Sequence, residues 1–339
     1  MQVRTTILVG EGMTTTGLGE NAQRPPATTR PLRVHHLERV APHVLLVELR
    51  DPEGEALPPY DPGAHIDVHL PDGAVRSYSL CGDPADRSAY RIAVLNQPGG
   101  RGSRFIHGEL RLGTTVAVAP PRNNFRFDDS PRYRFIAGGI GITPLLPMIR
   151  AAARRGADWV LHYCVRSAAE APFLAELREL GNGRVTVHAA DEGRRLAVTD
   201  LLAATPDDAL IYCCGPQRLM DAVAAAARPS QDVRFEWFTP RADAGRDAAP
   251  DGRFEVVCAR SGVTVAVKEG VSVLDALDAA GVPVASSCEQ GICGTCETAV
   301  LEGEPDHRDS VLSDAERAAG KSMMICVSRA RSARLVLDV

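Results

Sequence analysis

The sequence lacks the features that would place the chain in or across a membrane. No apolar segment approaches the roughly 20 residues that a spanning helix requires. The first residues contain one short apolar patch, Ile7-Leu8-Val9, and no signal-peptide core. We therefore expect a cytoplasmic protein with no membrane partner.

The sequence also lacks a large net charge of either sign. The formal net charge is -5, and no run of five like charges occurs, whereas a nucleic-acid-binding protein needs a basic face. No Ser–His–Asp or paired-carboxylate motif is present, so general acid–base hydrolysis is not expected. The 339 residues, 45% apolar and 24% charged, are typical of a globular protein of two or three domains, which we expect to be a monomer.

Cysteine is the residue that is present in an unusual arrangement. Without a secretory signal a disulfide framework is not expected, so clustered cysteines are better interpreted as metal ligands. Cys288, Cys293 and Cys296 follow a C-x4-C-x2-C pattern, and Cys326 lies further on. This is the plant-type 2Fe–2S spacing, in which a tight loop supplies three thiolates and a distant segment the fourth. A structural zinc site is the alternative, but zinc ribbons usually present two C-x2-C pairs and this chain has one.

The pattern changes along the chain divide it into segments. Residues 1–30 are rich in Thr, Gly, Pro and Ala and predict a flexible extension. Residues 31–129 alternate in short runs broken by turns, which predicts an antiparallel β-barrel. Residues 130–240 repeat strand, glycine turn and helix, which predicts an α/β domain with a parallel sheet. A polar linker is expected at 241–252, and a small α+β domain at 253–339.

Individual elements follow from the same periodicities. Ser272 is expected to cap a helix that ends near Gly281. The predicted strands are 43–50, 65–70, 74–80, 90–95, 114–120, 133–139, 159–165, 184–190, 209–215, 254–259 and 263–268, and the predicted helices are 143–156, 171–180, 216–227 and 272–281.

A first ligand motif lies in the predicted barrel. Alternation along "RSYSL" (76–80) places Arg76 and Tyr78 on one face of a strand, which suits a phosphate and a flat ring. An ordinary strand with an exposed arginine is the alternative. The following "QPGGRGSRF" (97–105) combines glycines, a serine and a helix start, as in an anion-binding nest, although a plain glycine turn would look similar.

A second motif opens the α/β domain. In "AGGIGITP" (137–144) the glycines permit close backbone approach and the helix start favours a phosphate, although this is not the G-x-G-x-x-G fingerprint. A tight strand–helix turn without a ligand is the alternative. "YCCGP" (212–216) ends a later strand of the same domain. Arg166 follows the second strand, where an acidic residue would favour NAD and a basic one can hold the 2′-phosphate of NADP.

Together these motifs resemble those of a known family of proteins. "SSCEQGICGTCET" with "MMICVSRA" (323–330) resembles the C-terminal ferredoxin domain of the phthalate dioxygenase reductase family, of the vanillate O-demethylase reductase type. The resemblance extends from about residue 31 to the end of the chain. It implies a flavin-binding β-barrel, a nucleotide domain like those of the ferredoxin–NADP reductase superfamily, and a β-grasp ferredoxin domain. It favours FMN over FAD and NADH over NADPH, with both choices left open.

The resemblance also implies roles for single residues. Ser79, Cys214 and Phe238 are expected near the hydride path, where the cofactors and not the side chains carry the chemistry. The cluster ligands are Cys288, Cys293, Cys296 and Cys326. The cofactor-binding residues are Arg76, Tyr78, Ser79, Gly102, Ser103, Gly138, Gly139, Gly141, Thr143, Arg166, Cys214, Gly215, Pro216 and Phe238.

The function that this implies is electron transfer. A hydride passes from NAD(P)H to FMN, and single electrons leave through the cluster to a terminal Rieske-type non-haem iron oxygenase. Two alternatives remain, a reductase for a cytochrome P450 and a redox-sensing iron–sulfur flavoprotein. Glu289 and Glu297 flank the cluster loop, and an acidic rim there would steer a basic partner surface.

Overall fold

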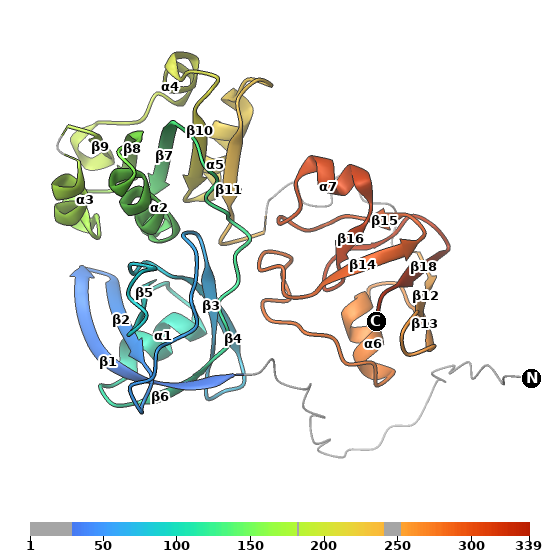
Figure 1. Ribbon diagram of the computed structural model, residues 1–339. Coiled ribbons are helices and arrows are strands. Elements are labelled where there is room, and N and C mark those ends of the chain that lie inside the picture. Colours follow the sequence, from blue (N-terminus) through green and yellow to red (C-terminus); the bar gives the residue numbers. More distant parts are fainter. Residues whose placement is uncertain (1–28, 182, 241–251) are drawn as a thin grey trace, which may run out of the picture. The chain divides into compact units, whose positions relative to one another are not determined.

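The computed structural model describes residues 29–181, 183–240 and 252–339 (Figure 1). These residues form two compact units, one that ends at Phe238 and one that begins at Thr239. The predicted extension 1–30 and linker 241–252 lie almost entirely outside the described residues. Arg30 is an exception, because it begins the first strand and does not belong to an extension.

The first part of the larger unit is a six-stranded antiparallel sheet in the order β4-β3-β6-β1-β2-β5. Alternate residues face its core, so Leu32 and Val34 are buried while their neighbours are exposed. The helix after the glycine-rich loop is α1, Arg101–Gly108. The strands are β1 Arg30–Ala41, β2 Val44–Arg50, β3 His65–His69, β4 Val75–Ser79, β5 Tyr90–Leu95 and β6 Thr115–Val118.

This sheet is antiparallel, as predicted. Whether it closes into a barrel depends on the contact between its two edge strands. The two edge strands β4 and β5 share no continuous ladder. A single bridge between Leu80, just after β4, and Ile92 in β5 brings the edges together at one point. A closed barrel therefore stays a prediction.

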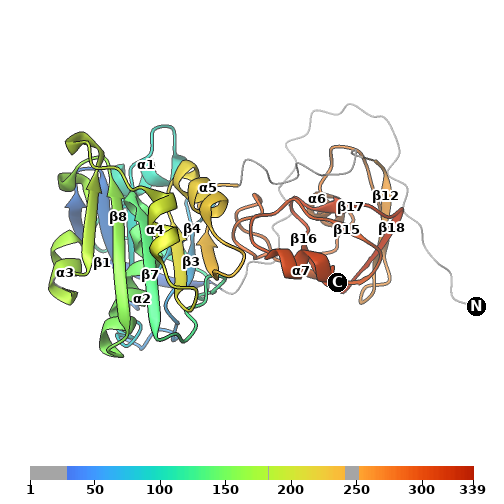
Figure 2. The same ribbon diagram turned by 90° about the horizontal axis from the view of Figure 1, so that it is seen from above.

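The second part of the larger unit is a five-stranded parallel sheet in the order β11-β10-β7-β8-β9 (Figure 1). Figure 2 shows two of its strands, β7 and β8, from another direction. This confirms the predicted α/β parallel-sheet pattern. The strands are β7 Arg132–Gly138, β8 Asp158–Val165, β9 Val185–Ala189, β10 Leu210–Cys214 and β11 Val233–Glu236. The helices are α2 Ile142–Arg154, α3 Leu174–Leu180, α4 Val198–Ala204 and α5 Gln217–Ala226.

Helices cover both faces of this sheet because successive side chains of each strand point in opposite directions. Phe135 of β7 packs in a core with α2 and α3, while Ile136 packs with Leu202 of α4 and Met220 of α5. From β7 the chain runs to β8 and β9 on one side, then returns to β10 and β11 on the other. The order therefore reverses between β7 and β10, and the carboxyl ends of these strands form the crevice in which open α/β sheets bind ligands.

The smaller unit has a mixed five-stranded sheet, β13-β12-β18-β14-β16, and a two-stranded sheet, β15-β17. Ser272 caps its first helix by accepting the Asp275 N–H, as predicted. A second helix with a Ser313–Glu316 capping box was not predicted. The strands are β12 Phe254–Cys258, β13 Thr264–Val267, β14 Glu297–Glu302, β15 Pro305–Asp306, β16 Ser322–Met324, β17 Arg329–Ala330 and β18 Arg334–Leu337, and the helices are α6 Val273–Ala279 and α7 Asp314–Ala319.

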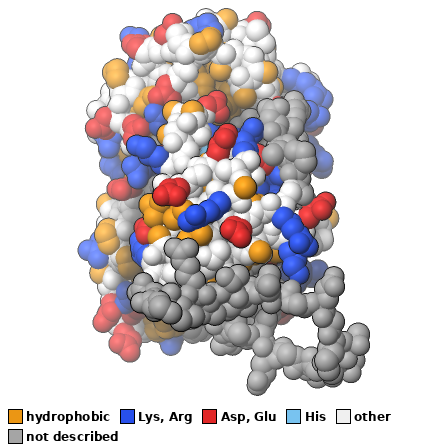
Figure 3. Space-filling model, turned by 90° about the vertical axis from the view of Figure 1, so that its right-hand side faces the viewer, with side chains coloured by type: hydrophobic (Ala, Val, Ile, Leu, Met, Phe, Trp, Pro, Cys, Tyr) orange, Lys and Arg blue, Asp and Glu red, His pale blue; other side chains and the backbone are white. Residues whose placement is uncertain are grey.

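Two surface properties follow the sequence. Within the described ranges no helix has the length and apolar character needed to cross a bilayer. On the face drawn in Figure 3, acidic and basic side chains are interspersed rather than gathered into a field of one sign. That mixture agrees with the small net charge of the chain.

Candidate cofactor and electron-transfer sites

The two halves of the flavin motif lie against each other. A Cβ atom added to Gly102 in α1 would lie 2.8 Å from Cγ of Arg76 and 3.1 Å from the Tyr78 hydroxyl. Only a glycine therefore lets the helix start approach β4 so closely. Burial raises the pKa of Tyr78 to about 12, so its ring and hydroxyl remain neutral. The predicted set Arg76, Tyr78 and Gly102 thus forms one surface.

Ser103 closes the glycine-rich loop from inside. Its buried hydroxyl lies within hydrogen-bond distance of the carbonyl oxygens of Gly100 (3.1 Å) and Gln97 (3.3 Å), and it accepts the Gln97 N–H at 3.2 Å. The hydroxyl therefore holds the loop that leads into α1. The helix start beside Arg76 combines backbone N–H groups with a guanidinium, which is the donor set that a phosphate requires.

The glycine turn of the α/β domain adopts a conformation that few other residues tolerate. Gly139 has a φ of 53° and begins a single 3-10 turn, Gly139–Gly141, between β7 and α2. Thr143 is buried in the first turn of α2, and its hydroxyl donates to the Ile140 carbonyl at 3.0 Å. Thr143 therefore fixes the turn, and α2 begins at the carboxyl end of β7.

The turn and the "YCCGP" segment are in direct backbone contact. A Cβ atom on Gly141 would lie 2.2 Å from the Cys214 carbonyl oxygen, and one on Gly138 would lie 2.4 Å from Cδ of Pro216. A Cβ on Gly215 would lie 2.9 Å from the Gly138 backbone. The two predicted motifs therefore form one continuous surface at the switch point between β7 and β10.

Cys214 is fully buried in this surface. Burial holds the pKa of its thiol well above the ordinary range, and the neighbouring Glu236 and Cys213 act in the same direction. A thiol in this state is a poor nucleophile. That Cys214 packs beside the hydride path and does not react covalently stays a prediction.

Glu236 is a site residue to which the sequence gave no role. It ends β11 opposite Cys214, and the Ser79 hydroxyl donates to its Oε2 atom at 3.2 Å. The residue is partly exposed, but its carboxyl group is enclosed, and this burial raises its pKa to about 8. The signal in the sequence was an acidic residue between aromatic ones in "FEWF" (235–238). Ser79 and Glu236 thus connect the flavin strand to the nucleotide domain.

The aromatic residues after β11 differ in their contacts. Trp237 stacks on Phe235, with ring centroids 5.6 Å apart. Phe238 is a large hydrophobic residue with 37% of its surface exposed. An exposed aromatic ring at the strand end is available to cover a flat ligand, so the geometry favours Phe238 over Trp237 for that position.

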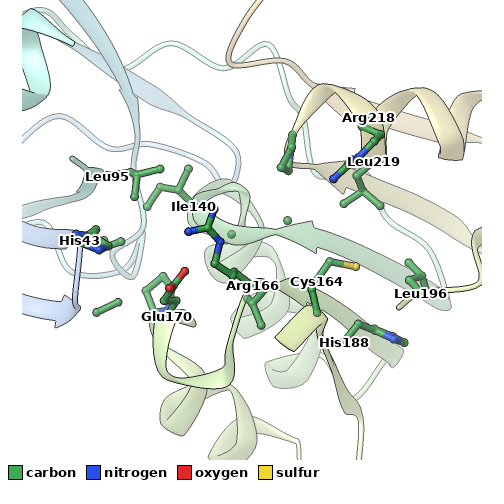
Figure 4. A pocket seen from close by; sticks show the side chains of 18 of the residues that line it. His43, Leu95, Ile140, Cys164, Arg166, Glu170, His188, Leu196, Arg218 and Leu219 are labelled. Carbon is green, nitrogen blue, oxygen red and sulfur yellow. The ribbon is translucent and has the colours of Figure 1, made fainter. Parts of the chain in front are cut away.

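A cavity of about 1080 Å³ lies at the carboxyl ends of the parallel strands, between this domain and the antiparallel sheet (Figure 4). Gly138, Gly139 and Pro216 line it, and so does Arg166. Figure 4 shows the Arg166 side chain reaching into the space beside Ile140, with Arg218 on the opposite wall. The cavity exceeds the range of drug-sized ligand sites, and a dinucleotide is a ligand of suitable size.

The four predicted cluster ligands converge in two pairs. The thiols of Cys288 and Cys293 are within hydrogen-bond distance of each other, and so are those of Cys296 and Cys326. Cys293, Cys296 and Cys326 are buried, whereas Cys288 is partly exposed. Among the described residues no three His, Cys, Asp or Glu side chains surround a single point as one metal ion requires. Two thiol pairs fit two irons, with two thiolates for each, better than one tetrahedral zinc ion.

The loop that carries three of these cysteines wraps tightly. Gly291 has a φ of 67°, and a Cβ atom there would lie 2.6 Å from the Val327 side chain. The Gln290 N–H donates to Sγ of Cys288 at 3.3 Å, and the Thr295 hydroxyl lies 3.0 Å from Sγ of Cys293. Such donors stabilise thiolate charge, so the residues present fit a 2Fe–2S cluster.

Three domain families match the chain in the order of these sites. The oxidoreductase FAD-binding domain matches residues 31–127 and the oxidoreductase NAD-binding domain matches residues 135–225. The 2Fe-2S iron-sulfur cluster binding domain matches residues 256–331. The fold and the sites therefore define a flavin-, pyridine-nucleotide- and iron–sulfur-dependent oxidoreductase.

Proteins that are similar to nearly the whole chain identify its family within this class of oxidoreductases. The chain is 48% identical over 322 residues to phenoxybenzoate dioxygenase subunit beta of Ectopseudomonas oleovorans, covering 92% of this chain and 99% of that protein. It is 42% identical over 309 residues to the vanillate O-demethylase oxidoreductase of a Pseudomonas strain, covering 88% and 96%. The chain belongs to the phthalate dioxygenase reductase family, as its motifs predicted.

Solved structures agree. Phthalate dioxygenase reductase superposes with a TM-score of 0.66 and 38% identity, covering 92% of this chain and 98% of that one. An intact type IV self-sufficient cytochrome P450 monooxygenase superposes with a TM-score of 0.85 and 43% identity over 92% of this chain. The chain spans 41% of the length of that larger protein.

Proposed function

We propose that this protein is the reductase component of a terminal oxygenase system that passes electrons from NAD(P)H through FMN and a 2Fe–2S cluster. The observation that carries the proposal is that one chain contains all three sites. These are the two thiol pairs for the cluster, the Arg76–Tyr78–Gly102 surface for the flavin and the joined glycine motifs for the coenzyme. A flavin can exchange two electrons together or one at a time, whereas a 2Fe–2S cluster exchanges one at a time. The flavin and the cluster together therefore link a hydride donor to a one-electron acceptor.

Each site residue has a role in this proposal. Arg76 and the α1 start hold the flavin phosphate, and Tyr78 lies against its ring. The resemblance to phthalate dioxygenase reductase supports FMN over FAD. The turn Gly138–Gly141 with Thr143, and Gly215–Pro216 across from it, receive the coenzyme pyrophosphate. Phe238 would cover the flavin face on which the nicotinamide has to dock.

The Ser79–Glu236 contact lies where the nicotinamide ring of the coenzyme is expected to bind. At neutral pH the raised pKa keeps much of the Glu236 population protonated. A neutral carboxyl group can donate a hydrogen bond toward the ring edge, and it adds no negative charge where a hydride departs. Cys214 supplies a dry packing surface beside it.

The partner we propose is a Rieske-type non-haem iron oxygenase. The names of the relatives support it, since they include components of a phenoxybenzoate dioxygenase and a 3-chlorobenzoate-3,4-dioxygenase. A second candidate is a cytochrome P450, which the similarity to the self-sufficient P450 monooxygenase favours. A redox sensor has no such support among these relatives.

The test is the spectrum and turnover of the purified protein. We expect flavin and iron–sulfur absorption bands, extraction of FMN, and rapid reduction of ferricyanide and cytochrome c with a reduced nicotinamide coenzyme. Reconstitution with a Rieske oxygenase and with a P450 then separates the two partners. Absence of either chromophore, or turnover too slow for an electron supply, would refute the proposal.

A further inference from the structure

The cluster site of the smaller unit is built from two separate stretches of sequence. One is the cysteine loop, residues 288–296, and the other is the stretch that carries Cys326. The two stretches touch at Gly291, because a Cβ atom there would lie 2.6 Å from Cγ2 of Val327. The Gly291 N–H also interacts with the sulfur atom of Cys326. The geometry of the site therefore depends on what holds Gly291 in place.

A third segment, residues 308–312, bridges these two stretches. It lies between β15 and α7 (Figure 1). The Ser310 N–H donates to the Gly291 carbonyl at 2.8 Å, and the Arg308 N–H donates to the Ser328 hydroxyl at 3.1 Å. Ser328 is fully buried and lies two residues after the fourth cysteine. The bridging segment is thus bonded to the cysteine loop on one side and to the other cysteine-bearing stretch on the other.

Asp309 lies within the bridging segment and holds its shape. Its side chain is fully buried, and its Oδ2 atom accepts the N–H groups of Val311 at 3.0 Å and Leu312 at 2.8 Å. Two backbone donors on one carboxylate oxygen fix the turn that presents the Ser310 N–H to the cysteine loop. A Cβ atom on Gly291 would lie 3.1 Å from Cα of Asp309. The buried carboxylate therefore belongs to a residue that packs directly on the loop.

A guanidinium group faces the carboxylate of Asp309 at a longer distance. The Nη2 atom of Arg317 lies 3.7 Å from Oδ2, which makes an ion pair without a hydrogen bond. The same guanidinium donates to the backbone carbonyls of Asp309 and Leu312. The His307 ring, whose Nδ1 atom lies 3.9 Å from Oδ1, stays neutral because burial lowers its pKa. Arg317 is thus the positive charge that balances Asp309.

We propose that Asp309 positions the cysteine loop and holds the reduction potential of the cluster low. The potentials of iron–sulfur clusters depend on nearby net charge, on hydrogen bonds to the sulfurs and on exposure to solvent. Reduction adds one electron from the flavin without forming or breaking a bond, so a fixed negative charge in a buried site opposes it. A lower potential makes the reduced cluster a stronger electron donor. This role rests on the proposed function and adds the residue that tunes its last carrier.

Asp309 and Arg317 should shift the potential in opposite directions. Asp309→Asn keeps the shape and an acceptor oxygen but removes the negative charge, so the potential should rise. Arg317→Gln removes the facing positive charge, so the potential should fall, and Arg317→Lys should restore it. A residue with a purely structural role would reduce the iron content or the free energy of unfolding in each variant. It would not produce shifts of opposite sign.

The test is a potentiometric titration of the full-length holoprotein with dithionite and mediator dyes, followed by electron paramagnetic resonance of the reduced cluster. At a fixed potential we expect Asp309→Asn to raise the ratio of reduced to oxidised cluster at least about threefold, which is about 30 mV for a one-electron couple. Arg317→Gln should lower the ratio by a similar factor. The iron content of each variant is measured in parallel, so that loss of the cluster is separated from a change in its potential.

Asp306→Asn is the matched control. Asp306 is buried to the same extent, but its carboxylate pairs with Arg308 and Arg331. We expect its ratio to stay within about twofold of the wild type while its stability falls. If Asp309→Asn loses its cluster, the fall in potential in Arg317→Gln and its recovery in Arg317→Lys decide the question.

The titration requires neither coenzyme nor partner protein, so it separates the two levels of inference. Equal potentials in Asp309→Asn and the wild type, or shifts of the same sign in Asp309→Asn and Arg317→Gln, would overturn the role of Asp309. If NAD(P)H still reduces such a protein, the proposed function stands. Opposite shifts in a protein that no nicotinamide coenzyme reduces would support Asp309 and refute the proposed function. Absence of the cluster from the wild type would overturn both.

Discussion

The hydroxyl of Ser79 lies 3.2 Å from Oε2 of Glu236, across 157 positions of sequence. This contact joins the end of the flavin strand β4 to the end of β11 in the nucleotide domain. It brings a group with a pKa of about 8 to the place where the two cofactors are expected to meet.

The raised pKa of Glu236 predicts a loss of stability with rising pH. Burial raises the pKa from its ordinary 4.5 to about 8, so the folded state binds one proton more than the unfolded state between these values. The stabilisation is complete below about pH 4.5 and is lost as the pH rises through 8. The free energy of unfolding of the wild type, obtained from thermal unfolding, should therefore fall more steeply than that of Glu236→Gln between pH 5 and 8, by up to about 1.4 kcal/mol per pH unit. Parallel pH profiles of the two proteins would contradict the assignment.

The cluster assignment predicts a split between two activities. Cys293→Ser removes one thiolate of a pair, so the iron content and the reduction of cytochrome c should fall by at least about tenfold. Reduction of the flavin by the coenzyme should persist, because the altered residue lies in the other compact unit. Cys258→Ala, which alters a free cysteine of the same unit, is the control and should retain the iron. Full iron content in Cys293→Ser would refute the assignment.

The contact between the glycine turn and "YCCGP" predicts a severe effect of a single methyl group. In Gly141→Ala the new Cβ would overlap the Cys214 carbonyl, so the backbone must shift, at a cost of about 1–3 kcal/mol in the free energy of unfolding. Urea denaturation measures this change, and coenzyme-dependent flavin reduction should fall with it. Gly108→Ala is a matched control, because nothing lies within 4 Å of its added Cβ. Equal stability of the two variants would contradict the packing.

The acidic rim expected at the cluster predicts salt dependence of partner reduction. Glu289 is exposed in the cysteine loop. Glu289→Lys should slow electron delivery to the oxygenase several-fold at low ionic strength, with the difference shrinking as salt is added. Glu269→Lys changes an exposed acid of the turn after β13 and serves as the control. A flat salt profile, or equal rates in both variants, would exclude steering by this rim.

The parts of the site that depend on local sequence were predictable. The cysteine spacing and the two glycine turns are motifs in which neighbouring residues perform one task together. Gly138 and Gly141 of the first motif both lie against the backbone of the "YCCGP" segment. Many strand and helix positions followed from periodicity, but the first strand β1, the last parallel strand β11, the helices α4 and α7, and the strands after the cysteine loop were not predicted.

The features of the site that depend on contacts between residues far apart in the sequence were not predictable. Burial raises the pKa of Glu236 and the hydrogen bond from Ser79 partly opposes this, and no local pattern reveals either contact.

The pairing of the cluster thiols has a consequence for how the smaller unit folds. Cys288 and Cys293 are near neighbours in sequence, but Cys296 and Cys326 enclose twenty-nine residues that include β14, α7 and β16. A group bonded to both pairs is therefore a crosslink, and it restricts the unfolded chain as a disulfide would, mostly through the longer loop. A bound cluster would hold the segment around Cys326 against the loop that carries the other three cysteines. It would therefore raise the free energy of unfolding of this unit as well as serve as its redox centre.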